Sequence, residues 1–187
     1  TLIVEHANSI RKLREEMTGL ITDEHDDIYF LRYIISNKGV NEKCIEACKV
    51  ATEWRKEHKE ILDDLKAGGL PPKHDIISKY MKVTKHKYFA DGSPILLTRP
   101  SLCNPKELMN VATVEDVCLW VTFVKEQFWI ECDTLTRKKG ILVKMTAMHD
   151  LRNFGAMKFR DKRFMEAFGQ VSNLGDKLHP QLLHRSI

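Results

Sequence analysis

The chain contains two adjacent His-Asp pairs, His74-Asp75 and His149-Asp150, of the kind that ligates metal ions in phosphohydrolases. In such a site a neutral imidazole and a carboxylate share one ion. Neither pair is accompanied in the sequence by a third or fourth ligand at a matching helical spacing. A metal-dependent phosphohydrolase is therefore an alternative that we carry forward, with His149 as the residue on which its activity would depend.

The cysteines offer a second kind of chemistry. Their number is odd, and most of them lie beside bulky apolar residues in stretches that we expect to be helical: Cys44, Cys48, Cys103, Cys118 and Cys132. Cys44 and Cys48 have the spacing of zinc ligands on a helix, but no second pair completes a site with four ligands. We interpret the five as buried, reduced thiols, which is typical of a cytosolic protein.

The other catalytic patterns fail on spacing. Cys132 and Arg137 are one residue too close together for the anion-binding loop of cysteine phosphatases. The sequence also lacks G-x-S-x-G, G-x-x-x-x-G-K-[ST] and G-x-G-x-x-G, the motifs of serine hydrolases, P-loop proteins and dinucleotide-binding proteins. We therefore expect no enzyme activity and no cofactor.

Composition and charge narrow the possible partners. The 187 residues are 43% hydrophobic and carry 30 Lys and Arg against 26 Asp and Glu, a formal charge of +4. This weak excess lacks the dense basic stripe of a nucleic-acid binder, so no nucleic acid is expected as a partner, whereas an anionic membrane surface is compatible with it. No apolar run is long enough to span a bilayer. We expect a cytoplasmic protein that is peripheral at membranes.

The sequence before the break GGLPP, at residues 68–72, has a helical pattern throughout. Apolar residues recur at helical spacing around Ile10, Leu13 and Met17. The acidic run DEHDD favours a helix through IYFLRYII, which Gly39 ends. Asn41 can cap the next helix, so that two antiparallel helices are joined by a short turn. One face of this second helix carries Cys44, Ala47, Cys48, Ala51 and Trp54.

After the break the pattern is mixed. KVTKHKYF and PILLTR flank a turn sequence and predict two strands. Thr113 and Asp116 resemble a capping box that opens a long helix to about Leu135. GILVKMTAM predicts a strand, and a helix follows over Phe164 to Leu174. The fold class is therefore α/β: a helical N-terminal subdomain, then a mixed or parallel sheet that is flanked by helices.

The helical segment DDIYFLRYIISNKGVNEKCIEACKVATEWRKEH resembles the N-terminal region of CRAL-TRIO proteins. Phe30-Leu31-Arg32-Tyr33 and Trp54-Arg55 match the family pattern, while Ile35 and Asn37 stand where arginines are usual. The resemblance continues through Tyr88-Phe89, through Asp91-Gly92-Ser93-Pro94, which is similar to the hairpin of the family, and through Arg99. Within the family, TRPSLCNPKELMNVATVEDV is most similar to the α-tocopherol and retinaldehyde-binding types.

The resemblance covers residues 1–67 as the helical region and 73–187 as part of a lipid-binding domain. It implies a cytosolic, non-catalytic carrier that transfers a tocopherol, retinoid or phospholipid between membranes, with a transient membrane surface as its partner and phosphoinositides as one candidate component. The residues implied to line its pocket are Leu96, Thr98, Val114, Cys118, Val121, Lys125, Ile141, Val143 and Met145. Side chains alternate between the two faces of a strand, and this alternation independently places Ile141, Val143 and Met145 on one face. The same side chains could instead pack on one another.

The end of the chain departs from the family pattern. Thr146 and His149 replace the Asp and Gly of a family Asp-Leu-x-Gly turn. Gln181 stands where phosphatidylinositol-binding members have a glutamate, which argues against that specificity. In the family this region leads into another strand, a gate helix, and a last strand and helices. Because none of these follows Ile187, we expect a truncated domain. A protein-interaction module of the same fold is the second alternative.

Overall fold

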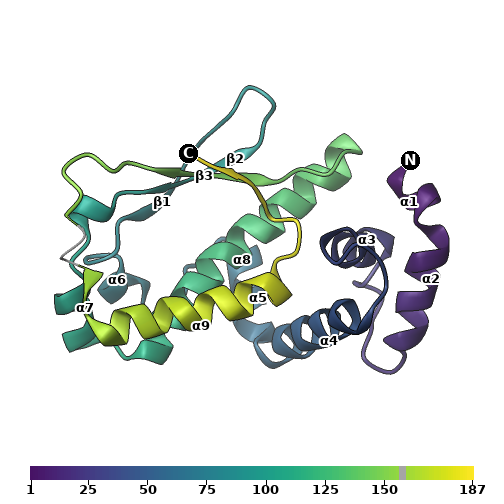
Figure 1. Cartoon of the computed structure of the whole chain (residues 1–187), viewed down its shortest axis with the longest axis horizontal. Coiled ribbons are helices and arrows are strands. Elements are labelled where there is room, and N and C mark those ends of the chain that lie inside the picture. Colours follow the sequence, from purple (N-terminus) through teal and green to yellow (C-terminus); the bar gives the residue numbers. More distant parts are fainter. Residues whose placement is uncertain (156–158) are drawn as a thin grey trace. The chain divides into compact units, whose positions relative to one another are not determined.

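A computed structural model describes residues 1–155 and 159–187, and the chain divides into two compact units. The first unit contains Thr1–Leu62 together with Leu174–Gln181, and the second contains Asp63–Asn173 together with Leu182–Ile187. The elements are labelled in Figure 1. The proposed functional residues all belong to the second unit.

The first unit is helical. Its helices are α1 (Leu2–Glu5), α2 (Ala7–Glu16), α3 (Asp27–Ser36) and α4 (Glu42–Glu57). The Asp26 carboxylate accepts hydrogen bonds from the backbone N–H groups of Ile28 and Tyr29, both at 3.1 Å. The Asn41 side chain accepts one from the N–H of Cys44 at 3.0 Å. These caps satisfy donors that a helix start leaves unpaired, and they confirm the predicted helix starts.

The core of the first unit is built from the apolar faces of these helices, with Leu178 of α9 (Lys162–Leu178) added. Cys44, Cys48 and Ala51 are completely buried there. All five cysteines of the chain are free and buried, as predicted. Cys103 is the one among them that lies outside the described α-helices.

The two thiols of α4 are expected to be chemically inert in the folded protein. Burial raises the pKa of Cys44 to about 11 and that of Cys48 to about 12. Because the thiolate is the nucleophile, iodoacetamide at pH 8 should modify both at least about 100-fold more slowly than in guanidinium-unfolded protein. Peptide mass spectrometry after timed alkylation measures this ratio. Equal rates in the two conditions would contradict it.

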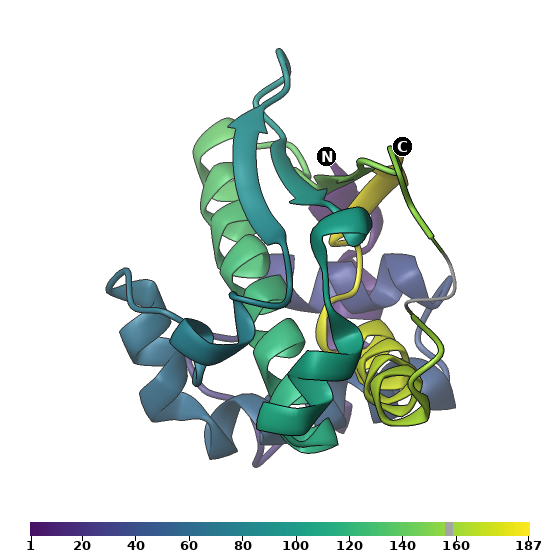
Figure 2. The same cartoon turned by 90° about the vertical axis from the view of Figure 1, so that its left-hand side faces the viewer.

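The second unit contains the sheet. From its start the chain forms α5 (Lys59–Lys66), α6 (His74–Ile77), β1 (Val83–Tyr88), β2 (Pro94–Thr98), the short 3₁₀ helix η1 (Pro100–Leu102) and α7 (Pro105–Val111). Then come α8 (Val114–Lys139), β3 (Met145–His149), α9 and β4 (Leu183–Ser186). The tip of the β1–β2 hairpin projects beyond the rest of the sheet (Figures 1 and 2). The predicted hairpin is thus confirmed.

The strand order is β1-β2-β3-β4, with β1 antiparallel to β2 and the other neighbours parallel. Helix α8 connects β2 to β3, and α9 connects β3 to β4, which confirms the predicted parallel crossover. One expectation is wrong: we predicted no strand between the last helix and Ile187, whereas Leu183–Ser186 forms β4. β4 pairs with β3 from Leu183 onward, directly after the buried Leu182.

Helix α8 begins as predicted. The Thr113 hydroxyl accepts from the Asp116 N–H at 3.1 Å, and the Asp116 carboxylate accepts from the Thr113 N–H at 3.0 Å, which completes a capping box. The helix runs to Lys139, one turn beyond the expected end near Leu135. It ends at Gly140, whose φ of 69° is a left-handed cap that suits glycine. Basic residues in the last turn favour this extension.

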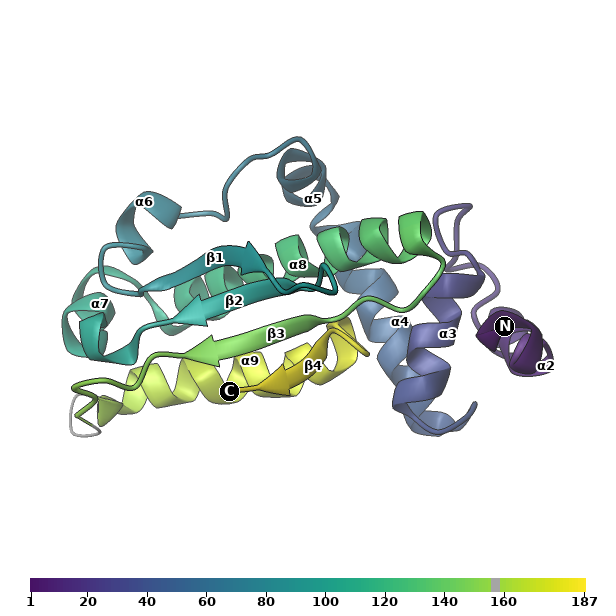
Figure 3. The same ribbon diagram turned by 90° about the horizontal axis from the view of Figure 1, so that it is seen from above.

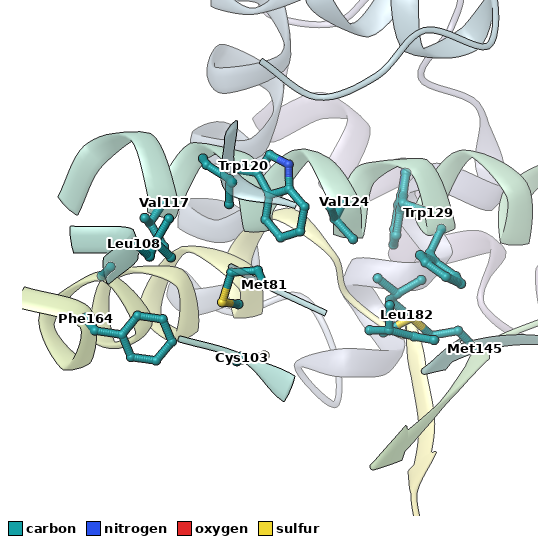
Figure 4. Close-up of a cluster of buried hydrophobic side chains, with 14 of the residues drawn as sticks. Met81, Cys103, Leu108, Val117, Trp120, Val124, Trp129, Met145, Phe164 and Leu182 are labelled. Atoms are coloured by element: carbon teal, nitrogen blue, oxygen red, sulfur yellow. The ribbon is translucent and has the colours of Figure 1, made fainter. Parts of the chain in front are cut away.

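The core of the second unit lies between α8, α7 and one face of the sheet. Figure 4 shows Trp120, Val124 and Trp129 of α8 pointing toward Met81, Leu182 and Met145. Trp120 is 1% exposed and is among the largest fully buried side chains. This packed cluster holds α8 against the sheet. The strand residues that point inward, such as Leu96 and Met145, are therefore in contact with side chains of the core.

The strand predicted over GILVKMTAM is shorter than expected. β3 starts at Met145, and residues 141–144 form no strand. Val143 and Met145 are buried in the same core cluster, but Ile141 is 64% exposed. The expectation that Ile141 shares a strand face with them is therefore wrong. The left-handed cap at Gly140 turns the chain, and extended pairing begins only after this turn.

Candidate functional site

The strand register separates the sheet into two faces. On β1, Lys85 forms an ion pair with Glu131 of α8 at 2.6 Å, so Lys85 points toward the helices. In-register partners in neighbouring strands point the same way. Lys85 pairs with Leu96, Leu96 with Ala147, and Ala147 with Ser186. These residues define the inner face, which α8 and α9 cover (Figures 1 and 3).

The residues between them point the other way and form the outer face. It includes Ile95, Leu97, Thr146, Met148 and Arg185. In Figure 3 the strands lie in front of α8 and α9, and no described helix of this unit passes over the outer face. Parallel sheets are normally covered on both faces and carry apolar residues on each. The outer face has the apolar residues of a covered face without a described helical layer.

A side-chain strap crosses the outer face. The guanidinium carbon of Arg185 lies 5.0 Å from the centre of the Phe89 ring, a cation–π contact. Arg185 starts on β4, whereas Phe89 follows β1 and hydrogen-bonds through its N–H to Ser93. Because neighbouring strands are about 4.8 Å apart, the arginine side chain must pass over β3 to reach the ring. Its path therefore crosses the face of β3 that carries Thr146, the partner of Arg185 in the register.

Thr146 carries an unpaired hydroxyl on this face. The residue is 1% exposed, and its Oγ1 has no hydrogen-bond partner among the described residues. A buried hydroxyl without a partner costs about 1–3 kcal/mol, so native proteins rarely leave one unused. Ile95 and Leu97 beside it on β2 are also buried, at 5% and 8% exposure. The outer face therefore combines buried apolar residues with two polar groups, the hydroxyl of Thr146 and the guanidinium of Arg185.

Several of the predicted pocket residues lie elsewhere, on the inner face. Leu96, Val143 and Met145 belong to the packed core under α8. The Thr98 hydroxyl lies at the end of β2, 2.6 Å from Nδ1 of His149. Ile141 stands apart in the turn after α8. The structure thus brings three of these five together, with core side chains as their neighbours.

The remaining predicted residues are on α8. Val114 and Val121 are partly buried against the core, Cys118 is buried, and Lys125 is half-buried. The surface cavities in the described part of this unit include the following two. One of about 460 Å³ lies beside the start of α8, and one of about 590 Å³ lies beside η1. Of the nine predicted lining residues, Val114 alone lines either of these two cavities.

A hydrogen-bonded line joins the carboxyl ends of the parallel strands. His149 Nδ1 contacts the Thr98 hydroxyl, and its Nε2 lies 2.8 Å from the Ser186 hydroxyl. Both ring nitrogens are therefore used to tie β2, β3 and β4 together. Among the described residues, no three His, Cys, Asp or Glu side chains gather in a way that could hold a metal ion.

Asp150, the other half of this His-Asp pair, is also occupied. Hydrogen bonds from the Arg152 side chain, at 2.8 and 2.6 Å, lower the pKa of Asp150 to about 2. Its carboxylate is thus charged and engaged with a cation of its own loop. The phosphohydrolase hypothesis finds no further ligands around this pair in the described part of the chain.

Our sequence reasoning missed the outer-face residues Ile95, Leu97 and Met148. One signal could have found them: PILLT in β2 is a run of consecutive apolar residues rather than an alternating one. Such a run indicates a strand that is covered on both faces. We named Thr146 because it departs from the family turn. The face of the sheet to which Thr146 points could be assigned only from the pairing register of the strands.

Comparison with models of protein families gave no match to the chain, and comparison with curated proteins gave none either. None of the described helices combines the length and apolar character needed to cross a bilayer. The two faces of the sheet, as the strand register defines them, are therefore the basis of the proposed function.

Proposed function

We propose that this protein binds a hydrophobic small molecule or lipid on the outer face of its sheet and transfers it between membranes. The observation that carries the proposal is the apolar outer face of a mixed sheet whose crossover helices α8 and α9 both lie on the inner face. Covering such a face removes apolar surface from water at roughly 25 cal/mol per Å². A lipid tail supplies that cover.

The resemblance to CRAL-TRIO proteins supports the same proposal, because it implies a sheet that forms the floor of a lipid pocket. The proposal shifts the floor from Leu96 and Met145 to residues of the same strands that point to the opposite face, Leu97 and Met148. Neighbouring strand residues point to opposite faces, so a resemblance that finds the correct strands still leaves the face open. Membership of this family is part of the proposal.

Native mass spectrometry of the purified chain, followed by organic extraction, tests the proposal. We expect one lipid-sized adduct per chain. Met148→Asp, on the outer face, should abolish it, because a carboxylate on that floor would have to be desolvated. Val111→Asp is the matched control, since Val111 lies on α7 and is 49% exposed. A bare mass, or a stoichiometric protein partner without lipid, would contradict the proposal.

The start of α9 is our candidate for membrane contact. Met165 and Phe168 lie one helical turn apart with 56% and 37% of their surfaces exposed, and Phe154 before the helix is 41% exposed. The exposed basic residues Arg160 and Lys162 lie between them in the sequence. Exposed apolar side chains beside cations are suited to an anionic bilayer surface.

Cosedimentation with vesicles of phosphatidylcholine and phosphatidylserine tests this contact. Met165→Asp should reduce the bound fraction at least about threefold, since its new charge opposes both insertion and attraction to the lipid surface. The same variant should keep its lipid adduct. If Met148→Asp alone lowered vesicle binding, the membrane contact would have to be placed on the outer face instead.

A further inference from the structure

The outer face carries two polar groups that its apolar residues do not use. Thr146 Oγ1 is buried without a hydrogen-bond partner, and Arg185 is its partner in the strand register. Among the described residues, the guanidinium of Arg185 makes its cation–π contact with Phe89 and forms no ion pair with a carboxylate. An arginine of this kind can donate two parallel hydrogen bonds to a carboxylate.

Asp91 is the carboxylate whose titration responds to this arginine. Hydrogen bonds from the hydroxyl and the N–H of Ser93, at 2.6 and 2.8 Å, are the main causes that lower the pKa of Asp91, while Lys139 and Arg185 add smaller effects. The Asp91 oxygen Oδ1 is thus already committed to Ser93. Within the described part of the chain no ion pair joins Asp91 to Arg185, so the guanidinium donors can serve an added carboxylate.

We infer that the ligand is an amphiphile with a carboxylate head group, which Arg185 and Thr146 hold while the tail lies along Ile95, Leu97 and Met148. This inference rests on the proposed function and names its ligand class. A planar carboxylate accepts the paired N–H groups of the guanidinium and one hydroxyl hydrogen. Binding moves Arg185 off Thr146, so the strap opens as the head group enters.

Competition against the neutral dye Nile red separates the outcomes, with oleate, oleyl alcohol and methyl oleate as displacing probes. For the natural sequence, oleate should displace the dye at about tenfold lower concentration than the two uncharged probes. A difference in affinity of about tenfold is what one charge-assisted hydrogen bond typically contributes. Arg185→Gln should remove this preference. Arg137→Gln is the matched control, because Arg137 lies on α8 and is bonded to Asp133 at 2.7 Å.

Thr146→Val provides a readout that a purely structural role would not give. The change replaces an unpaired buried hydroxyl by a methyl group of similar size, so stability should stay the same or rise. Oleate binding should nevertheless weaken by about threefold to tenfold, because one hydrogen bond to the head group is lost. Weaker binding together with lower stability would indicate a packing defect and would count against a head-group contact.

Two failures remain distinguishable. If all three probes displace the dye equally, or if Arg185→Gln keeps the preference for oleate, the carboxylate inference is overturned while hydrophobic binding stands. If Nile red and the three probes do not bind at all, the proposed function itself fails and the inference falls with it.

Discussion

Replacing Leu96 by aspartate is expected to destabilise the fold by at least about 4 kcal/mol, whereas the same change at Leu97 should cost only about 1–2 kcal/mol. The two residues are neighbours in β2 and are equally exposed, at 8% each. They differ in the face they occupy. Leu96 lies in the packed core under α8, while Leu97 lies on the outer face, where no described helix of this unit has to be displaced to hydrate a new carboxylate.

Urea unfolding of Leu96→Asp and Leu97→Asp, followed by circular dichroism, measures the two costs. Leu96→Met and Leu97→Met serve as controls, since a swap that conserves volume usually costs less than about 1.5 kcal/mol. Equal large losses for both aspartates would show that the outer face is packed as tightly as the inner one. The proposed ligand floor would then have no room for a ligand.

Trp120→Ala is expected to cost about 3–5 kcal/mol, the usual range for removing a buried aromatic side chain. Trp120 fills the core between α8 and α6, with its ring centre 6.0 Å from that of His74. Its indole N–H has no hydrogen-bond partner among the described residues. Trp120→Phe, which removes this unpaired donor and keeps most of the volume, should therefore cost about 1–2 kcal/mol.

The melting temperature and the urea midpoint of both variants test this order. Ile141→Ala provides the comparison, because Ile141 is 64% exposed and a surface change of this kind should stay within about 0.5 kcal/mol. A Trp120→Phe variant as unstable as Trp120→Ala would contradict the argument and would indicate that the indole nitrogen has an essential partner.

The sequence alone determined the parts of the fold that depend on neighbouring residues. Asn41 and the Thr113–Asp116 capping box were identifiable as helix starts, since a cap needs only residues within one turn. The helical spacing of α3 and α4, the hairpin and the parallel crossover were likewise predictable. The α/β class follows from this order of elements.

The tertiary structure decided which residues share a face of the sheet. The strand predicted from Gly140 begins only at Met145, so Ile141 lies outside the sheet, and β4 occupies residues that we expected to precede a missing strand. Only the register between strands shows that Leu97, Thr146 and Arg185 share a face while Leu96 points to α8. The physical reason is that a shift of one residue reverses every side chain in a strand, and pairing between distant segments sets that shift.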